Sequence, residues 1–331
     1  MNDTRKFKKI FIAGITGAAG SYLADYIVAR HPNVCVHGLA RGQSKAARRN
    51  LAGVESRVEI HYADLTDLHA VLEVLYLVRP DGIVHVASDA DVRASFKAPL
   101  PVLYNNMMGA AHLLDAVRQL KLDPYILICS SSEVYGRVDP RHIPVNETCP
   151  LQGVNPYSVS KVTQDLLGEC YFLCYGMKII RARMFPYISP RRPDLFASAF
   201  ATQVARIEAG LQTELTHGNL DAKRTLLDAR DAAEALWIAL TQGRPGEVYN
   251  IGAKNPVTIR EFLEILKQKA RRPIPSRVDP GLLRPTDIAL SIPDTAKFET
   301  ETGWQPKYAF ADTVDHLLDY CRKQVEREKK K

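Results

Sequence analysis

Tyr157 and Lys161 stand four residues apart in the segment Tyr157-Ser-Val-Ser-Lys161. On a helix, this spacing places both side chains on one face. A free tyrosine has a pKa of about 10, and a nearby ammonium group favours its phenolate form. Such a tyrosine can exchange a proton with a substrate hydroxyl while a hydride leaves the adjacent carbon. The pair therefore predicts oxidation or reduction of an alcohol, provided that a helix presents both residues to a hydride acceptor.

The segment Ser130-Ser-Ser-Glu133 adds hydroxyl groups and a carboxylate. We expect Ser131 to hydrogen-bond the reacting oxygen beside Tyr157, with Ser132 next to it. A simple alcohol dehydrogenase needs only the serine, the tyrosine and the lysine, so Glu133 is an additional group. It can remove a proton α to a ketone, or it can orient the substrate or cap a turn. The residues alone leave these roles of Glu133 open.

A hydride acceptor is indicated by the segment Gly14-Ile-Thr-Gly17-Ala-Ala-Gly20, which follows an expected strand and opens an expected helix. Glycines there permit a tight turn and let the backbone approach a pyrophosphate, which the helix N-terminus stabilises. A strand–helix turn without a ligand is the alternative for the glycines taken alone. The context favours a dinucleotide site. The residues expected to bind it in this loop are Gly14, Thr16, Gly17 and Gly20.

The end of the second expected strand bears on which dinucleotide is bound. NAD sites usually carry an acidic residue there to hold the ribose 2′-hydroxyl, but Ala40-Arg41-Gly42 contains none. Arg41 can pair with a 2′-phosphate, although a solvated basic loop is the other interpretation. NADP is therefore the expected cofactor, with NAD as the alternative. Three further cofactor residues are expected: Asp64 and Leu65 at the adenine, and Ala87 at the end of the fourth strand.

Short apolar runs that alternate with helical stretches provide the frame for these residues. Strands are expected at 10–13, 34–39, 58–62, 83–87, 125–130 and 178–183, and helices at 21–30, 67–78, 106–120 and 156–175. This alternation indicates a parallel sheet with crossover helices. The carboxyl ends of its strands face the cofactor crevice. The predicted fold class is α/β, a Rossmann-type doubly wound parallel sheet.

The pattern changes after about residue 185. Prolines interrupt 185–194 and 273–285, and a short strand at 247–251 lies among expected helices at 197–210, 228–241, 258–270 and 311–327. These elements are too mixed to form a large independent domain. We therefore expect an NADP-binding domain at residues 1–184. Residues 185–331 are expected to form mainly a smaller substrate-binding lobe, with some segments returning to the sheet.

Composition and charge disfavour several classes of protein. The 331 residues are 46% hydrophobic and 24% charged, which is typical of globular domains. No apolar run reaches the roughly 18 residues of a membrane span, and the polar, basic N-terminus is unlike a signal peptide, so a cytoplasmic location is expected. The six cysteines form no CxxC pair and no histidine cluster joins them, so no metal site is predicted.

The net charge of +7 is confined to the two ends of the chain. The first nine residues contribute +3, the last ten contribute +4, and the 34 basic residues between them balance 34 acidic ones. A nucleic-acid-binding face would need basic residues gathered on the folded body. Solvated tails are therefore the favoured interpretation, and no nucleic-acid partner is expected.

Over almost its full length the sequence resembles the extended short-chain dehydrogenase/reductase superfamily, and within it the GDP-mannose 4,6-dehydratase branch. Ser131-Ser-Glu133 is similar to that branch's hydroxyl-x-Glu pattern, with Ser131 where threonine is more usual. The other motifs that carry the resemblance are Gly14-Ile-Thr-Gly17, His61-Tyr-Ala-Asp-Leu-Thr-Asp67, Ser189-Pro-Arg-Arg192, Gly218-Asn-Leu-Asp-Ala-Lys-Arg224 and Leu283-Arg-Pro-Thr-Asp287.

The resemblance implies a role for each matching residue. The catalytic residues would be Ser131, Glu133, Tyr157 and Lys161. The residues that bind a GDP-sugar would be Ser132, Arg192, Arg224, Arg284 and Asp287. Of these, Arg224 and Arg284 would hold the phosphates, as guanidinium forks do well, and Asp287 would lie at the ribose or base. Asn106 is similar to the superfamily's structural asparagine. A homodimer or homotetramer, formed through helices beside the active site, is also implied.

The chain departs from the dehydratase pattern in several places. Phe185-Pro-Tyr187 stands where Phe-Asn-His is usual, and Ala18-Ala19 stands where Gln-Asp is usual. The segments 197–200 and 247–252 are more similar to the sister GDP-4-keto-6-deoxymannose reductases. A sugar-nucleotide 4,6-dehydratase with recycled NADP is thus the leading expectation. An NADPH-consuming reductase is the first alternative, followed by a sugar-nucleotide epimerase and by a non-catalytic dinucleotide-binding protein.

Overall fold

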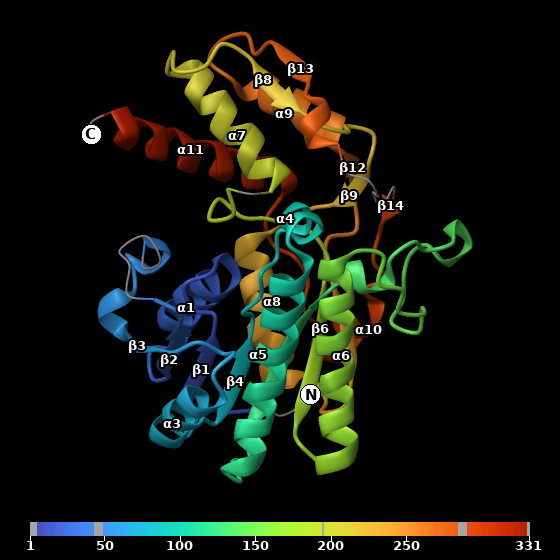
Figure 1. The fold of residues 1–331 in the computed structure, drawn as a ribbon. Coiled ribbons are helices and arrows are strands. Elements are labelled where there is room, and N and C mark those ends of the chain that lie inside the picture. The colour runs from blue at the N-terminus through green and yellow to red at the C-terminus, as the bar shows by residue number, and fades with distance from the viewer. Residues whose placement is uncertain (1–4, 43–48, 194, 284–289, 330–331) are drawn as a thin grey trace.

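A seven-stranded parallel sheet forms the centre of the computed structural model, which describes residues 5–42, 49–193, 195–283 and 290–329 (Figure 1). The strand order is β11-β6-β5-β4-β1-β2-β3. The chain first adds strands on one side of β1 and then crosses to the other side, which is doubly wound topology. The predicted fold class is confirmed. The strands are β1 (Lys9–Ala13), β2 (Cys35–Ala40), β3 (Val58–Tyr62), β4 (Gly82–His85), β5 (Tyr125–Ser131), β6 (Ile179–Met184) and β11 (Val248–Ile251).

Helices cover both faces of the sheet, because alternate side chains of each strand point to opposite faces. In β1, Ile10 and Ile12 join the core under one layer of helices, whereas Phe11 and Ala13 join the core under the other. The first layer contains α1 (Ala18–Arg30) and α8 (Ala229–Gln242), and the second contains α3 (Leu68–Val78), α5 (Pro99–Gln119) and α6 (Pro156–Tyr175).

A second group of elements lies above the carboxyl ends of the strands (Figure 1). It has its own buried core, which includes Phe200, Phe262 and Leu317. Its elements are α7 (Phe196–Glu208), β8 (Leu215–His217), α9 (Ile259–Lys269), β13 (Ser276–Val278) and α11 (Phe310–Lys329). Short strands connect it to the sheet: β7 (Tyr187–Ile188), β9 (Lys223–Thr225), β10 (Leu227–Asp228), β12 (Pro256–Thr258) and β14 (Leu290–Ser291).

Some elements differ from the sequence-based expectation. The helix expected from residue 106 begins at Pro99, because prolines are tolerated in a first helical turn. The short helices α4 (Val92–Lys97) and α10 (Ala296–Thr302) were not predicted, and β7 lies in a segment predicted as loop. The sheet also takes β11 from the second half of the chain, where it pairs with β6. Within the described ranges, no helix is both long and apolar enough to cross a membrane.

Candidate functional site

A cavity of about 910 Å³ lies where the carboxyl edge of the sheet meets the second group of elements. Its lining combines the N-terminal turn of α1, the end of β5, the first turns of α6 and the loop before α7. The switch point of a doubly wound sheet is where such a fold binds its ligands. The predicted site residues that line the cavity are Gly17, Gly20, Ser131, Ser132, Glu133, Tyr157, Lys161, Arg192 and Arg224.

The glycine loop is shaped so that side chains would not fit. Gly14 has a φ of 95°, and a Cβ on it would lie 2.7 Å from the Cα of Ala87. A Cβ on Gly20 would lie 2.3 Å from the carbonyl oxygen of Gly14. Gly17 stands at the N-cap of α1 and has no side chain with which to cap the helix. The first turn of α1 therefore presents backbone N–H groups and the positive end of its dipole to an anion.

The expected adenosine side of the site is built from the loops after β2, β3 and β4. The Arg41 guanidinium pairs with Asp89 (Nη2 to Oδ1, 3.0 Å) and donates to Asn105 Oδ1 at 3.3 Å. Burial raises the pKa of Asp64, but hydrogen bonds from Thr66 and the charge of Arg41 together lower it by more, so the net shift is downward. The remaining described members of the predicted cofactor set lie outside the lining of the cavity: Gly14, Thr16, Arg41, Asp64, Leu65 and Ala87.

Lys161 is held by two hydrogen bonds at the base of the cavity. Its Nζ donates to the carbonyl oxygen of Cys129 and to Oε1 of Gln164, both at 2.8 Å. The residue is 4% exposed, and burial lowers the pKa of its ammonium group. The positive charge of Arg192 lowers this pKa further. The ammonium group is thus fixed one turn of α6 beyond Tyr157.

Tyr157 is 7% exposed, and burial raises the pKa of its hydroxyl well above the usual value. A hydrogen bond with Ser131 and the charge of Arg192 act in the opposite direction, whereas the charge of Glu133 raises the pKa further. In the free protein the hydroxyl is therefore protonated at neutral pH. A cationic group brought into the cavity would favour its ionisation.

Glu133 is positioned by a short 3-10 helix, Ser132–Tyr135, directly after β5. Its backbone N–H donates to Ser131 Oγ at 3.2 Å, and its Oε2 accepts a hydrogen bond from Asn155 Nδ2 at 3.2 Å. Asn155 also caps α6, because its Oδ1 accepts from the N–H of Ser158 at 2.8 Å. The carboxylate and the helix that carries Tyr157 are thereby fixed to the same residue.

Asn106 connects α5 to the loop after β4 and to α6. Its Oδ1 accepts from the N–H of Asp89 at 2.7 Å, and its Nδ2 donates to Asp89 O at 3.1 Å and to Ser160 Oγ at 2.9 Å. Its own carbonyl oxygen accepts from Gln164 Nε2 at 2.7 Å. These contacts occupy its buried amide, which gives Asn106 a structural part in the site.

Three residues that support the site were not predicted. Gln164 holds Lys161, Asn155 holds Glu133, and His85 lies beside Gln164 with 3.5 Å between their Nε2 atoms. Burial, reinforced by the charge of Lys161, lowers the pKa of His85 to about 3. The contact between Gln164 and Lys161 could have been predicted from the sequence, because residues three apart on a helix share a face.

Three of the five residues expected to bind the substrate line the cavity: Ser132, Arg192 and Arg224. Arg192 lines the cavity and donates from Nη2 to Ala90 O at 3.2 Å, and Arg224 is a buried lining residue whose Nη1 donates to Lys223 O at 2.8 Å. Pro186 and Tyr187, which depart from the dehydratase pattern, also line the cavity. Arg284 and Asp287 lie outside the described residues.

Comparison with known proteins agrees with this architecture. GDP-mannose 4,6 dehydratase 1 of Arabidopsis thaliana is 31% identical over 348 residues, which cover 99% of this chain and 94% of that protein. A GDP-6-deoxy-D-mannose reductase of Pseudomonas aeruginosa is 28% identical over 97% of this chain and 99% of that protein. A GDP-mannose 4,6-dehydratase of Sordaria araneosa is longer: this chain is 29% identical to it and spans 61% of its length.

Solved structures give the same result. The Pseudomonas aeruginosa protein RMD, complexed with NADPH, superposes with a TM-score of 0.83 at 26% identity, covering 98% of this chain and 100% of that one. DesIV, a dTDP-glucose 4,6-dehydratase of Streptomyces venezuelae with NAD and TYD bound, has a TM-score of 0.84 at 26% identity, covering 96% and 98%. Residues 11–317 match the family model described as GDP-mannose 4,6 dehydratase. The chain therefore belongs to the GDP-mannose 4,6-dehydratase family.

Proposed function

We propose that this protein converts GDP-mannose, or a related GDP-sugar, into the corresponding GDP-4-keto-6-deoxy sugar and water, with NADP recycled in each turnover. The observation that carries the proposal is the shared cavity. Ser131, Tyr157 and Glu133 line it together with the glycine loop of α1. A hydroxyl pair for hydride chemistry and a carboxylate for proton removal are the groups that a 4,6-dehydration needs.

The glycine loop fits a dinucleotide. A Cβ on Gly14 would collide with the backbone of Ala87, and one on Gly20 would collide with the backbone of Gly14, so these glycines permit the tight turn. Gly17 leaves the N–H groups at the start of α1 open to a phosphate. NADP supplies the hydride acceptor when it is bound. We propose that Gly14, Thr16, Gly17 and Gly20 hold its phosphates, with Asp64, Leu65 and Ala87 along its adenosine. Arg41 would exchange its partner Asp89 for the 2′-phosphate, because a guanidinium group pairs well with a phosphate.

The first step is oxidation at C4 of the sugar. Tyr157 would accept the proton of the C4 hydroxyl as hydride leaves C4, with Ser131 donating a hydrogen bond to the same oxygen. Lys161, fixed by Cys129 and Gln164, would stabilise the phenolate form of Tyr157 when the site is filled.

The next step is loss of water. The C4 ketone acidifies the hydrogen on C5, and Glu133 would remove that proton. The hydroxyl group on C6 then leaves as water, protonated by Glu133 or Ser132. Hydride would return to C6 and a proton would be added to C5, so that the sugar is not oxidised overall. The C4 hydroxyl proton that Tyr157 accepted balances the C5 proton that left within the water. The hydrogen bond from Asn155 directs the carboxylate of Glu133.

The sugar nucleotide would enter between the sheet and the second group of elements. Arg192 and Arg224 line this side of the cavity, and we propose that they bind its diphosphate. From the sequence we propose the same task for Arg284, and contact with the ribose or base for Asp287. In this proposal residues 1–184 form the NADP-binding domain and residues 185–331 form mainly the substrate lobe.

Mass spectrometry of purified protein incubated with GDP-mannose, without added NADPH, tests the activity. Many equivalents of a product lighter by one water are expected per chain. An unchanged sugar nucleotide would contradict the proposal for GDP-mannose, and the same assay can then be applied to other GDP-sugars.

A reductase of 4-keto-6-deoxy sugar nucleotides is the second candidate. It is favoured by the segments 197–200 and 247–252, which are more similar to the reductases, and residues 197–200 line the cavity. A reductase would consume one NADPH for each keto sugar reduced. The absorbance of NADPH, followed after addition of a GDP-4-keto-6-deoxy sugar, separates this activity from the first.

A homodimer or homotetramer is proposed from the surface of the paired helices α5 and α6. Large apolar side chains are exposed on both: Leu100, Tyr104, Val159, Leu166 and Leu173. Burial of such a patch against a second copy would remove it from water. Light scattering after chromatography should give a dimer or larger, and Leu166→Glu with Leu173→Glu should reduce it to a monomer. A wild-type monomer would contradict the proposal.

A further inference from the structure

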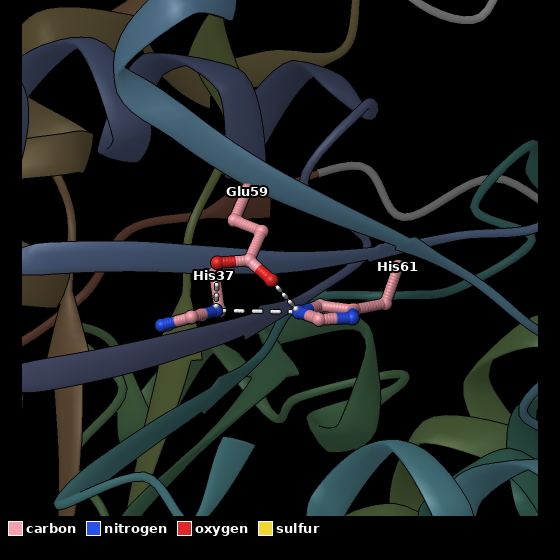
Figure 2. A group of neighbouring side chains, drawn as sticks. All are labelled: His37, Glu59 and His61. Carbon is pink, nitrogen blue, oxygen red and sulfur yellow. Dashed lines mark hydrogen bonds and ion pairs between the residues drawn. The ribbon is translucent and has the colours of Figure 1, made fainter. Parts of the chain in front are cut away.

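Three side chains with metal-binding atoms meet on the last two strands of the sheet (Figure 2), and none of them lines the cavity. They are His37 on β2 and Glu59 and His61 on β3. Nδ1 of His37 lies 3.2 Å from Nε2 of His61. The carboxylate oxygens of Glu59 lie 3.5 Å from His37 Nδ1 and 3.6 Å from His61 Nε2.

The register of the strands brings these residues together. His37 is paired with Glu59, and Leu39 is paired with His61. Residues two apart on a strand share a face of the sheet, so Glu59 and His61 point to the same side as their neighbour His37. Because β3 is the last strand of the sheet, the cluster lies at its margin.

The separations match those between ligands of one metal ion. Two atoms at about 2.0–2.1 Å from a tetrahedral zinc ion lie about 3.3 Å apart. The two imidazole nitrogens are 3.2 Å apart, and each lies within 3.6 Å of a different oxygen of the Glu59 carboxylate: Oε2 for His37 and Oε1 for His61. A hydrogen bond between the two imidazole nitrogens can use only one proton, whereas a cation between them would be bound by both lone pairs.

The exposure of the three side chains also suits a metal site. The imidazoles are 12% and 10% exposed and stack with an angle of 22° between their planes, which limits their freedom. The Glu59 side chain is 63% exposed, so water can reach the side of the cluster that the carboxylate occupies. Two imidazoles, one carboxylate and a water complete the four ligands that zinc takes in such sites.

We propose that His37, Glu59 and His61 form a binding site for a divalent transition-metal ion, with Zn²⁺ as the ion that fits the donor set best. The ion joins the edge strand β3 to β2. Both strands lead directly into loops of the expected adenosine side: Arg41 follows His37 by four residues, and Asp64 follows His61 by three. The ion therefore stabilises the two strands that precede these loops and takes no part in the proposed reaction.

Titration of the chelator-treated full-length protein with ZnCl₂, followed by calorimetry, tests the site. One ion per chain is expected. His37→Gln and His61→Gln should each weaken zinc binding by at least about 10- to 100-fold. That is the loss seen when a residue that only hydrogen-bonds to a metal ligand is replaced, and loss of a ligand itself costs at least as much. His69→Gln is the matched control. His69 also lies beside a carboxylate, with 3.3 Å between its Nε2 and Glu73 Oε1 on α3, but among the described residues it belongs to no group of three metal-binding side chains. It should leave the affinity unchanged.

Two further measurements make the result decisive. Glu59→Ala changes an exposed side chain and should keep the fold while lowering the affinity, so it tests the site if a histidine variant misfolds. Co²⁺ bound in place of Zn²⁺ should give the visible spectrum of a tetrahedral nitrogen and oxygen site. No stoichiometric binding, binding that survives both histidine substitutions, or a thiolate charge-transfer band would overturn the proposal.

Discussion

Asn155 holds the carboxylate of Glu133 with its amide nitrogen at 3.2 Å while its amide oxygen caps α6 at the N–H of Ser158. One side chain thus fixes the proposed base of the reaction to the helix that carries Tyr157. Because the two contacts use different atoms, their effects can be separated by substitution.

Asn155→Ser should keep the cap and lose the contact with Glu133, because a serine hydroxyl caps helices well but is too short to reach the carboxylate. Its stability should change little while kcat falls about tenfold or more. Asn155→Ala should lose the cap as well, at about 1 kcal/mol of unfolding free energy. Urea unfolding and initial rates measure the two effects. Equal kcat values for Asn155→Ser and the wild type would remove Asn155 from the positioning of Glu133.

Replacing Glu133 with Gln should abolish water loss and leave the fold intact. Oxidation at C4 does not need this carboxylate, so the variant should build up bound NADPH when the sugar nucleotide is added. Stopped-flow absorbance of the reduced nicotinamide and mass spectrometry of the product report the two steps. Full dehydration by Glu133→Gln would show that another group is the base.

Arg41→Ala should reduce the preference for NADP over NAD by about tenfold or more, since a charge-assisted hydrogen bond to the 2′-phosphate is lost. The affinity for NAD should change little. Arg57→Ala is a suitable control, because Arg57 is a basic residue of the next connection, in the 3-10 helix before β3. Fluorescence titration with both dinucleotides gives the ratio. An unchanged ratio would place the 2′-phosphate elsewhere.

His85 should make the protein sensitive to acid. Burial keeps its imidazole neutral in the fold, with a pKa of about 3, whereas the unfolded chain takes up a proton at about pH 6.5. Its folded pKa is lowered, so the unfolded state binds more protons between these values and stability falls as the pH falls. The loss from this group approaches about 1.4 kcal/mol per pH unit below pH 6.5, which amounts to about 2 kcal/mol between pH 6.5 and pH 4.5.

His85→Leu should therefore lose less stability over that pH interval than the wild type does. Urea unfolding at both pH values gives the difference, and His69→Gln serves as a control because the His69 side chain is 83% exposed. Parallel losses in the wild type and in His85→Leu would mean that other groups dominate acid unfolding.

Local signals made much of the sheet and of α6 predictable. Asn155 and Pro156 mark the start of α6 and Gly176 its end, so the sequence-based range agrees with the structure. The start of α5 was missed because Pro99 and Pro101 break most helices yet fit its first turn. The short strands of the second group are too brief to show an apolar period.

Contacts across the fold were not predictable in the same way. Asn155 and Glu133 are 22 residues apart, and Arg41 and Asp89 are 48 residues apart. The pairing of His37 with Glu59 depends on strand register, which no motif in the chain encodes. The sequence therefore predicted which residues line the cavity better than it predicted what holds them.

The central claim is that one hydride leaves C4 and returns to C6 within a single turnover. It is tested most directly with GDP-mannose that carries deuterium at C4. Purified protein with bound NADP should convert it to a 4-keto-6-deoxy product that has lost one water and retains the deuterium at C6, as NMR of the product will show. Loss of the deuterium to added NADP, or a product whose C6 still carries its hydroxyl, would contradict the account.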